Sequence, residues 1–72
     1  MRYFVIEIET TADGTAKQIT EKATIDEAKA LYHHILASVY ANTAITYALV
    51  QIVNDLGFCE VMERVPTAQP EE

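Results

Sequence analysis

Two stretches of this chain are apolar on both sides when each is drawn as a β-strand. They are YFVIEI at residues 3–8 and AITYALVQIV at residues 44–53. Successive residues of a strand point to opposite faces, so a sheet with one wet face alternates apolar and polar residues. Neither stretch alternates cleanly. Each is therefore expected to need cover on both faces of a sheet.

One helix is predicted between these stretches, from residue 25 to about residue 40 or 42. Thr24 and Glu27 fit a capping box, in which the Thr hydroxyl accepts a first-turn N–H and the Glu side chain returns to the N–H of the cap. Asn42 is the expected stop, because Asn tolerates the left-handed conformation common at helix ends. The side of the helix expected to lie on the sheet carries Ala28, Leu31, Tyr32, Ile35, Leu36 and Val39.

Four strands are predicted around this helix. Asp13-Gly14 and the segment 54–57, which ends in Gly57, are turn signals, because Gly adopts positive φ without strain. Pro66 ends the last strand, since it cannot donate to a ladder. The expected strands cover residues 2–10, 15–23, 44–53 and 58–65.

This order of elements predicts an α+β fold, ββαββ, with a four-stranded antiparallel sheet in the order 2-1-3-4 and the helix packed on one face. The two most apolar strands then lie in the centre and the two charged ones at the edges, which agrees with the pattern. Residues 1–66 should form a single domain and residues 67–72 a disordered acidic tail. Depending on the register, the uncovered face carries Tyr3 and Val5, or Phe4, Ile6 and Ile8.

A chain of 72 residues has a small core, which rarely contributes more than roughly 3–5 kcal/mol without a disulfide, a metal or a partner. A single cysteine, Cys59, cannot form an internal disulfide. Association is the remaining means of stabilisation, so we predict a homo-oligomer, most simply a two-fold dimer. The back of the helix is small and smooth, which fits either good helix propensity or a subunit contact; it carries Ala30, His33, His34, Ala37 and Ala41.

The net charge of the chain restricts the classes of molecule that it is expected to bind. Eleven carboxylates against five Lys and Arg residues give a net charge of −6. This balance disfavours direct binding to nucleic acid and to anionic membranes, while a basic protein remains a possible partner. The apolar run at residues 3–6 is too short for a signal peptide, and no run approaches the roughly 20 residues that span a bilayer. With a free cysteine, these features predict a cytoplasmic protein.

No catalytic, cofactor-binding or metal-ligating residue is predicted. His33 and His34 are adjacent, so on a helix they point about 100° apart and cannot readily share a metal. Cys59 lies beside Phe58 and Glu60 rather than a cation and is expected to be a buried structural residue. Glu7 and Glu9 share one face of a strand and are expected to be solvated carboxylates near a sheet edge. The chain is therefore not expected to be an enzyme or to bind a cofactor.

The first residues, MRYFVIEIET followed by ADGT at residues 12–15, resemble a group of small uncharacterised proteins encoded in phages and prophages of Firmicutes, especially gut clostridia. The resemblance covers about residues 1–41 and is looser in the second hairpin. It implies a genetic setting among tail, holin and lysin genes, and it assigns no activity and no site residue. In the helix the residues that carry it are Glu27-Ala28, Tyr32-His33 and Leu36-Ala37.

Three hypotheses of function follow. The first is a small oligomeric accessory protein of phage or prophage origin that acts by protein–protein contact with itself and with a phage or host protein. The second is an acidic inhibitor or nucleic-acid mimic that blocks a basic host protein, which would require carboxylates on one continuous surface. The third is a small ligand-binding oligomer or enzyme with a site between subunits, which would require a concave pocket with convergent polar groups.

Overall fold

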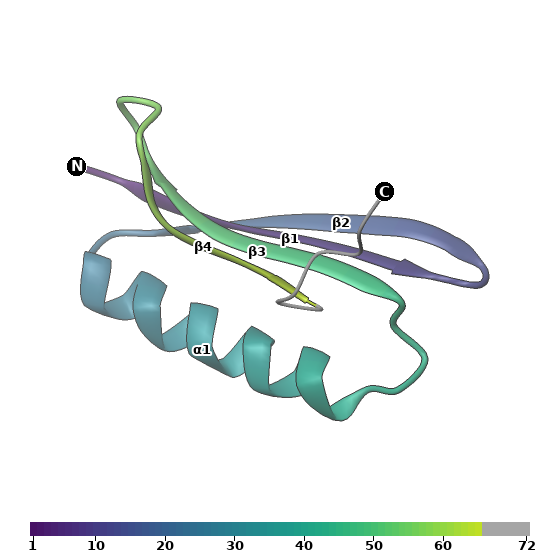
Figure 1. The fold of residues 1–72 in the computed structure, drawn as a ribbon. Coiled ribbons are helices and arrows are strands. Elements are labelled where there is room, and N and C mark those ends of the chain that lie inside the picture. Colours follow the sequence, from purple (N-terminus) through teal and green to yellow (C-terminus); the bar gives the residue numbers. More distant parts are fainter. Residues whose placement is uncertain (66–72) are drawn as a thin grey trace.

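The computed structural model describes residues 1–65, in which four strands and one helix follow the predicted order. All neighbouring strands are antiparallel in the order β2-β1-β3-β4, and α1 lies along one face of the sheet (Figure 1). The predicted ββαββ fold is thus confirmed, whereas the predicted tail lies outside the described residues. The elements are β1 (Tyr3–Thr11), β2 (Gly14–Lys22), α1 (Ile25–Ala41), β3 (Tyr47–Asn54) and β4 (Cys59–Val65).

The register decides which residues of the central strands face α1. Val5 of β1 lies level with Thr20 of β2 and Ile52 of β3. Val5 and Ile52 are buried beneath the helix, with exposed fractions of 1% and 0%. Odd-numbered residues of β1 and even-numbered residues of β3 therefore face α1. Of the two alternatives left open by the sequence, the uncovered face is the one with Phe4, Ile6 and Ile8.

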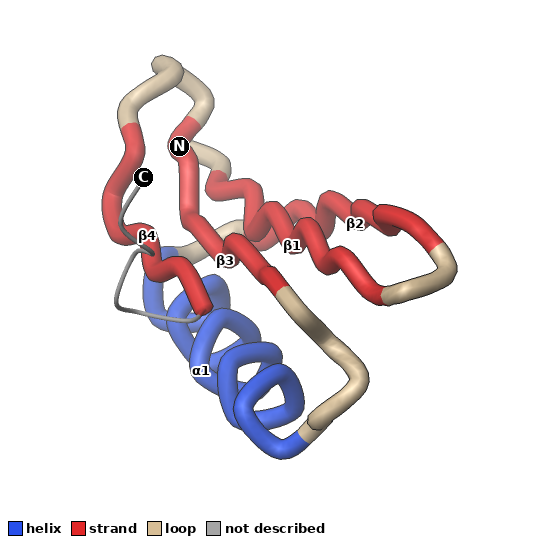
Figure 2. The backbone as a smooth tube through the Cα atoms, turned by 45° about the vertical axis from the view of Figure 1, so that its right-hand side comes forward, coloured by secondary structure: helices blue, strands red, loops and turns tan. Residues whose placement is uncertain are grey.

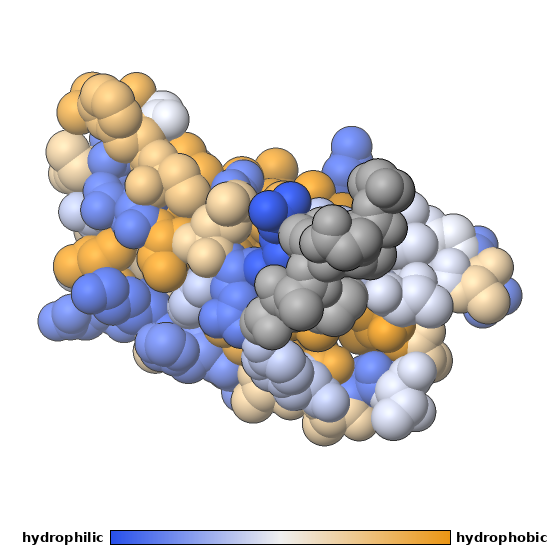
Figure 3. Space-filling view, in the orientation of Figure 1, coloured by the Kyte–Doolittle hydropathy of each residue, from blue (hydrophilic) through white to orange (hydrophobic). Residues whose placement is uncertain are grey.

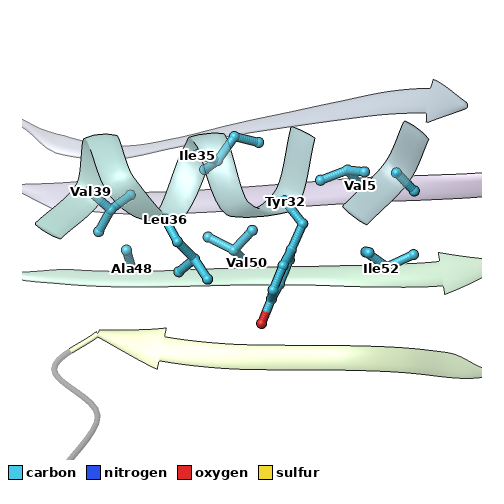
Figure 4. Packing of buried hydrophobic residues seen from close by; sticks show 9 residues of the cluster. Val5, Tyr32, Ile35, Leu36, Val39, Ala48, Val50 and Ile52 are labelled. Atoms are coloured by element: carbon cyan, nitrogen blue, oxygen red, sulfur yellow. The ribbon is translucent and has the colours of Figure 1, made fainter. Parts of the chain in front are cut away.

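The core lies between α1 and this face of the sheet (Figure 4). The residues predicted for the inner side of the helix are buried there, except Leu31, which is partly buried at its margin. In β3 every second residue is fully buried, which gives that strand one covered face and one half-exposed face. The buried core consists of Val5, Ala28, Tyr32, Ile35, Leu36, Val39, Ala48, Val50 and Ile52.

The two ends of α1 are held differently. At the start, the Thr24 hydroxyl accepts a hydrogen bond of 3.2 Å from the Glu27 N–H, as the capping pattern predicts. At the end, the prediction of a left-handed Asn42 is wrong, because its φ and ψ are −98° and 103°, which is extended backbone. The Asn42 N–H donates to the Val39 carbonyl at 3.2 Å, and its side-chain oxygen accepts the Ala44 N–H at 3.0 Å. Asn42 therefore ends the helix through its side chain.

The helix does not cover the whole length of the sheet. Figure 2 shows the β1–β2 hairpin extending away from α1, and Figure 1 shows the C-terminal end of α1 diverging from the sheet. In β1 only Val5 is fully buried, while Glu7, Glu9 and Thr11 on the same side are partly exposed. Polar residues thus occupy the part of β1 that the helix leaves uncovered.

Candidate interaction surface

The face of the sheet turned away from α1 carries several apolar side chains, and we call it the open face. Its centre is formed by the even-numbered residues of β1 and the odd-numbered residues of β3, and its margins by β2 and β4. In the described part of the chain, α1 packs only on the other side of the sheet (Figure 1). The open face carries Phe4, Ile6, Ile8, Thr10, Thr15, Lys17, Ile19, Glu21, Tyr47, Leu49, Gln51, Val53, Cys59, Met62 and Arg64.

Apolar side chains of the open face are in contact with solvent. Ile19 on β2 is 63% exposed and Met62 on β4 is 51% exposed. The apolar residues of the two central strands on this face are partly buried. Burying a side chain of this size stabilises a protein by roughly 1.5–3 kcal/mol relative to leaving it exposed. A partner that covered the open face would therefore add to the stability of the fold.

The β3–β4 turn adds to this surface. Figure 1 shows the turn bending to the side of the sheet opposite α1, and Figure 3 shows hydrophobic side chains gathered at that end of the molecule. Leu56 and Phe58 in the turn are each 67% exposed. The turn therefore forms a raised apolar lip at the end of the open face where Phe4 lies.

Asn54 holds this lip in place. Its side chain is buried, and its Oδ1 accepts hydrogen bonds from the backbone N–H groups of Leu56 at 2.9 Å and Phe58 at 3.1 Å. Its Nδ2 donates to Glu60 at 2.8 Å. Gly57 completes the turn with a φ of 90°, as predicted for this position. Sequence reasoning placed Asn54 in a turn but did not identify it as the residue that organises the turn.

The charges of the open face lie on its edge strands. Lys17 is level with Ile8 and Leu49, and Arg64 lies on the other side of the same row. Glu21 lies four residues farther along β2, level with Phe4, and forms an ion pair of 3.1 Å with Arg2. The open face therefore has an apolar centre and charged margins, a distribution that also occurs in protein–protein interfaces.

On the helix side of the sheet, Glu7 and Glu9 form a carboxylate pair. The pKa of Glu7 is raised from 4.5 to about 7, chiefly by its hydrogen bond with Glu9, then by burial and by the charge of Glu9. Both side chains are partly exposed, in keeping with contact with solvent, but they lie on a central strand instead of near a sheet edge. The shared face, in contrast, is as predicted.

The hollow beside this pair is small. It has a volume of about 90 Å³ and is lined by Glu7, Glu9, Ala16, Lys17 and Gln18. Ligand pockets for organic molecules usually have volumes of roughly 300–1,000 Å³, so this hollow holds only a few water molecules. The single chain therefore gives no support to a ligand site at the carboxylate pair.

Two tyrosines connect α1 with β4. The Tyr40 hydroxyl donates a hydrogen bond to the Glu63 carboxylate, and this bond raises the pKa of Tyr40. Tyr32 is buried in the core with its hydroxyl directed toward β4 (Figure 4). Burial, followed by the negative charge of Glu63, raises the pKa of Tyr32. The hydrogen bond between Tyr40 and Glu63 joins the helix to the edge strand.

The remaining candidate residues do not converge on a site. His33 and His34 are exposed on the helix, and the His33 ring packs edge-on against Tyr32 with 5.3 Å between centroids. The prediction of a buried Cys59 is wrong, since the thiol is exposed in the chain, 3.8 Å from the Gln51 side-chain oxygen. A register shift between Ile52 and Val53 places Cys59 opposite Val53, on the open face. Within residues 1–65, no three His, Cys, Asp or Glu side chains gather as a metal site requires.

Comparisons of the chain with protein-family models, with curated proteins and with solved structures find no match. The helix found in residues 1–65 is not long and apolar enough to cross a membrane. The open face, its lip and its charged margins are thus the features from which we infer a function.

Proposed function

We propose that the protein acts through protein–protein contact, with the open face as its contact surface, and that it works as a homo-oligomer, most simply a dimer. The observation that carries this proposal is the exposure of Ile19 and Met62 on the open face, whose opposite face α1 already covers, with Leu56 and Phe58 exposed in the turn that bends to the open side (Figure 1). Monomeric soluble proteins rarely expose contiguous apolar patches of more than a few hundred Å².

The size of the chain supports the same proposal. The described core contains nine buried apolar residues, all on the α1 side of the sheet. The chain has one cysteine and therefore no internal disulfide, so association through the open face is the remaining large source of stability. Covering that face with a protein surface would give the sheet the second layer that its central strands require.

The biological role is that of a small, non-enzymatic accessory protein in the cytoplasm, bound to itself and to a phage or host protein. The resemblance of residues 1–41 to small phage and prophage proteins of Firmicutes supports this setting. The free thiol of Cys59 is compatible with a reducing compartment. The net charge of −6 favours protein partners over direct contact with nucleic acid.

The proposal is tested by multi-angle light scattering at micromolar concentration, where the wild-type chain of 8.0 kDa should have about twice that mass. Ile19→Lys and Met62→Lys should lower the mass toward that of one chain, because each buries an ammonium group in an apolar contact. Ala37→Lys on the exposed back of α1 is the matched control and should leave the mass unchanged. If only Ala37→Lys dissociates the protein, the contact lies on the helix and the proposal is wrong.

A further inference from the structure

We infer that the open face binds a second copy of this chain face to face, with the strands of the two sheets antiparallel, so that Lys17 of each copy meets Glu21 of the other. This inference rests on the proposed function and specifies the partner and its orientation. Three observations carry it: the rows of residues across the open face, the position of the charges in those rows, and the size of the face.

The pairing of the strands arranges the open face in parallel rows. The middle row contains Ile6, flanked by Ile19, Gln51 and Met62. The neighbouring row on one side contains Ile8. The Ile8 row is completed by Lys17, Leu49 and Arg64, and the Phe4 row, on the other side, by Glu21, Val53 and Cys59.

Two identical sheets that pack face to face are related by a two-fold axis in the plane between them. The interface of a two-fold dimer uses the same surface patch on both copies. If that axis ran parallel to the strands, β2 of one copy would lie over β4 of the other. Lys17 would then face Arg64 across the interface, twice, in the same row. Like charges placed opposite one another at an interface are costly, so this arrangement is disfavoured.

An axis that crosses the strands at the middle row gives the opposite result. Each strand then lies over the same strand of the other copy, and the Phe4 row of one sheet faces the Ile8 row of the other. Lys17 faces Glu21 at two symmetric places, and the uncharged middle row faces itself. Packed sheets keep their strands within about 30° of alignment, so the rows remain in register near the axis. The charges of Lys17, Glu21 and Arg64 therefore favour the second orientation, in which Glu21 has Arg2 of its own chain and Lys17 of the other copy as cationic neighbours.

The lip fits the same orientation. The β3–β4 turn lies beyond the Phe4 row, since the Arg2 N–H donates to Asp55 and the Asp55 N–H donates to the Arg2 carbonyl. Across the two-fold axis, the region beyond the Phe4 row faces the row of Thr10, Thr15 and Tyr47 in the other copy. The exposed apolar side chains of the turn would thus cover the ring of Tyr47.

The area of the open face is sufficient for a stable dimer. Four strands spaced about 4.8 Å apart, each about 8 residues long at 3.3 Å per residue, give about 500 Å² in plan for each copy. Two copies therefore bury about 1,000 Å² before the relief of the side chains and the lip are included, which reaches the lower limit for a specific interface.

Other occupants of the face are less well matched. Residues 66–72 read PTAQPEE and contain no large apolar side chain that could replace a hydrophobic partner. A nucleic acid would meet an apolar centre instead of a basic surface. A second copy supplies apolar area and opposite charges at the required positions.

The inference is tested by charge exchange, with the dimer dissociation constant measured by analytical ultracentrifugation at low salt. Lys17→Glu alone and Glu21→Lys alone should each weaken the dimer roughly ten-fold or more, because each places two pairs of like charges in contact. The double variant should restore most of the wild-type affinity, since it forms the same pairs with exchanged signs. Lys29→Glu, on an exposed position of α1, is the matched control and should change little.

Each outcome separates the orientation from the proposed function. If Lys17→Glu tightens the dimer and Glu21→Lys has no effect, the axis runs parallel to the strands and the inference is wrong, while the open face still mediates contact. If Ile19→Lys dissociates the dimer but the double variant shows no rescue, the antiparallel orientation is likewise overturned. A wild-type chain that stays monomeric at 100-fold higher concentration overturns both proposals. A dimer that appears only after removal of residues 66–72 would show that this segment covers the face, and would also overturn them.

Discussion

Replacing Glu7 with Gln should remove a pH dependence that the carboxylate pair imposes on folding. The pKa of Glu7 is raised from 4.5 to about 7 in the folded chain. Between these two values, the folded state holds a proton that the unfolded state has released. The contribution of the Glu7 proton to the free energy of unfolding is therefore complete below pH 4.5. It is lost as the pH rises through 7, where Glu7 ionises beside Glu9.

The size of the effect follows from the same values. A rise from 4.5 to about 7 corresponds to at most about 3 kcal/mol. Glu7 and Glu9 are both partly exposed, so solvent screening reduces the effect to the order of 1 kcal/mol. We expect Glu7→Gln to raise the free energy of unfolding by about 1 kcal/mol at pH 8 and to leave it nearly unchanged at pH 4.5.

The measurement is urea unfolding followed by circular dichroism at pH 4.5 and pH 8, at one fixed protein concentration because association contributes to stability. Glu9→Gln is the matched variant, since the repulsion requires both carboxylates. In a double-mutant cycle at pH 8, Glu7→Gln should stabilise the wild type more than it stabilises the Glu9→Gln background. Equal effects in both backgrounds, or a loss of stability with Glu7→Gln at pH 8, would refute the reasoning.

Two further predictions concern the ends of secondary-structure elements. Asn54→Ala should lower the free energy of unfolding by about 2 kcal/mol, because the N–H groups of Leu56 and Phe58 lose their acceptor at a buried position; an unchanged urea midpoint would contradict this. Thr24→Ala should cost about 1 kcal/mol through loss of the hydrogen bond to the Glu27 N–H, and Thr24→Ser, which keeps the hydroxyl, should cost much less in the same assay.

The fold could be predicted from the sequence because its signals are local and mutually consistent. The cap at Thr24 fixes the start of α1, and Gly57 fixes the second hairpin turn. With one helix and two hairpins, a single strand order makes all neighbours antiparallel and places the apolar strands in the centre. Boundaries were less well determined: the third strand begins at Tyr47 instead of residue 44, since residues 44 and 45 form hydrogen bonds with Asn42.

The features that sequence reasoning missed depend on contacts between distant residues or on irregular pairing. The pKa of Glu7 is raised chiefly by its hydrogen bond with Glu9, and then by its partial burial and the charge of Glu9. Cys59 is exposed because a register shift at Val53 changes the face on which the first residue of β4 lies. The role of Asn54 requires its side chain to be buried beneath a turn and paired with Glu60, and no local pattern encodes that pairing.

The two faces of the central strands differ in how far their side chains are buried, and this difference links the fold to the proposed function. On one face, Val50 and Ile52 are completely buried by a helix of 17 residues that belongs to the same chain. On the other face, Ile6 and Leu49 are equally apolar but only partly buried, and no helix within residues 1–65 covers them. A strand that needed a single covered face would carry polar residues at these positions. This pattern supports the proposed contact between chains, in which a partner would cover the face of the central strands that α1 leaves open.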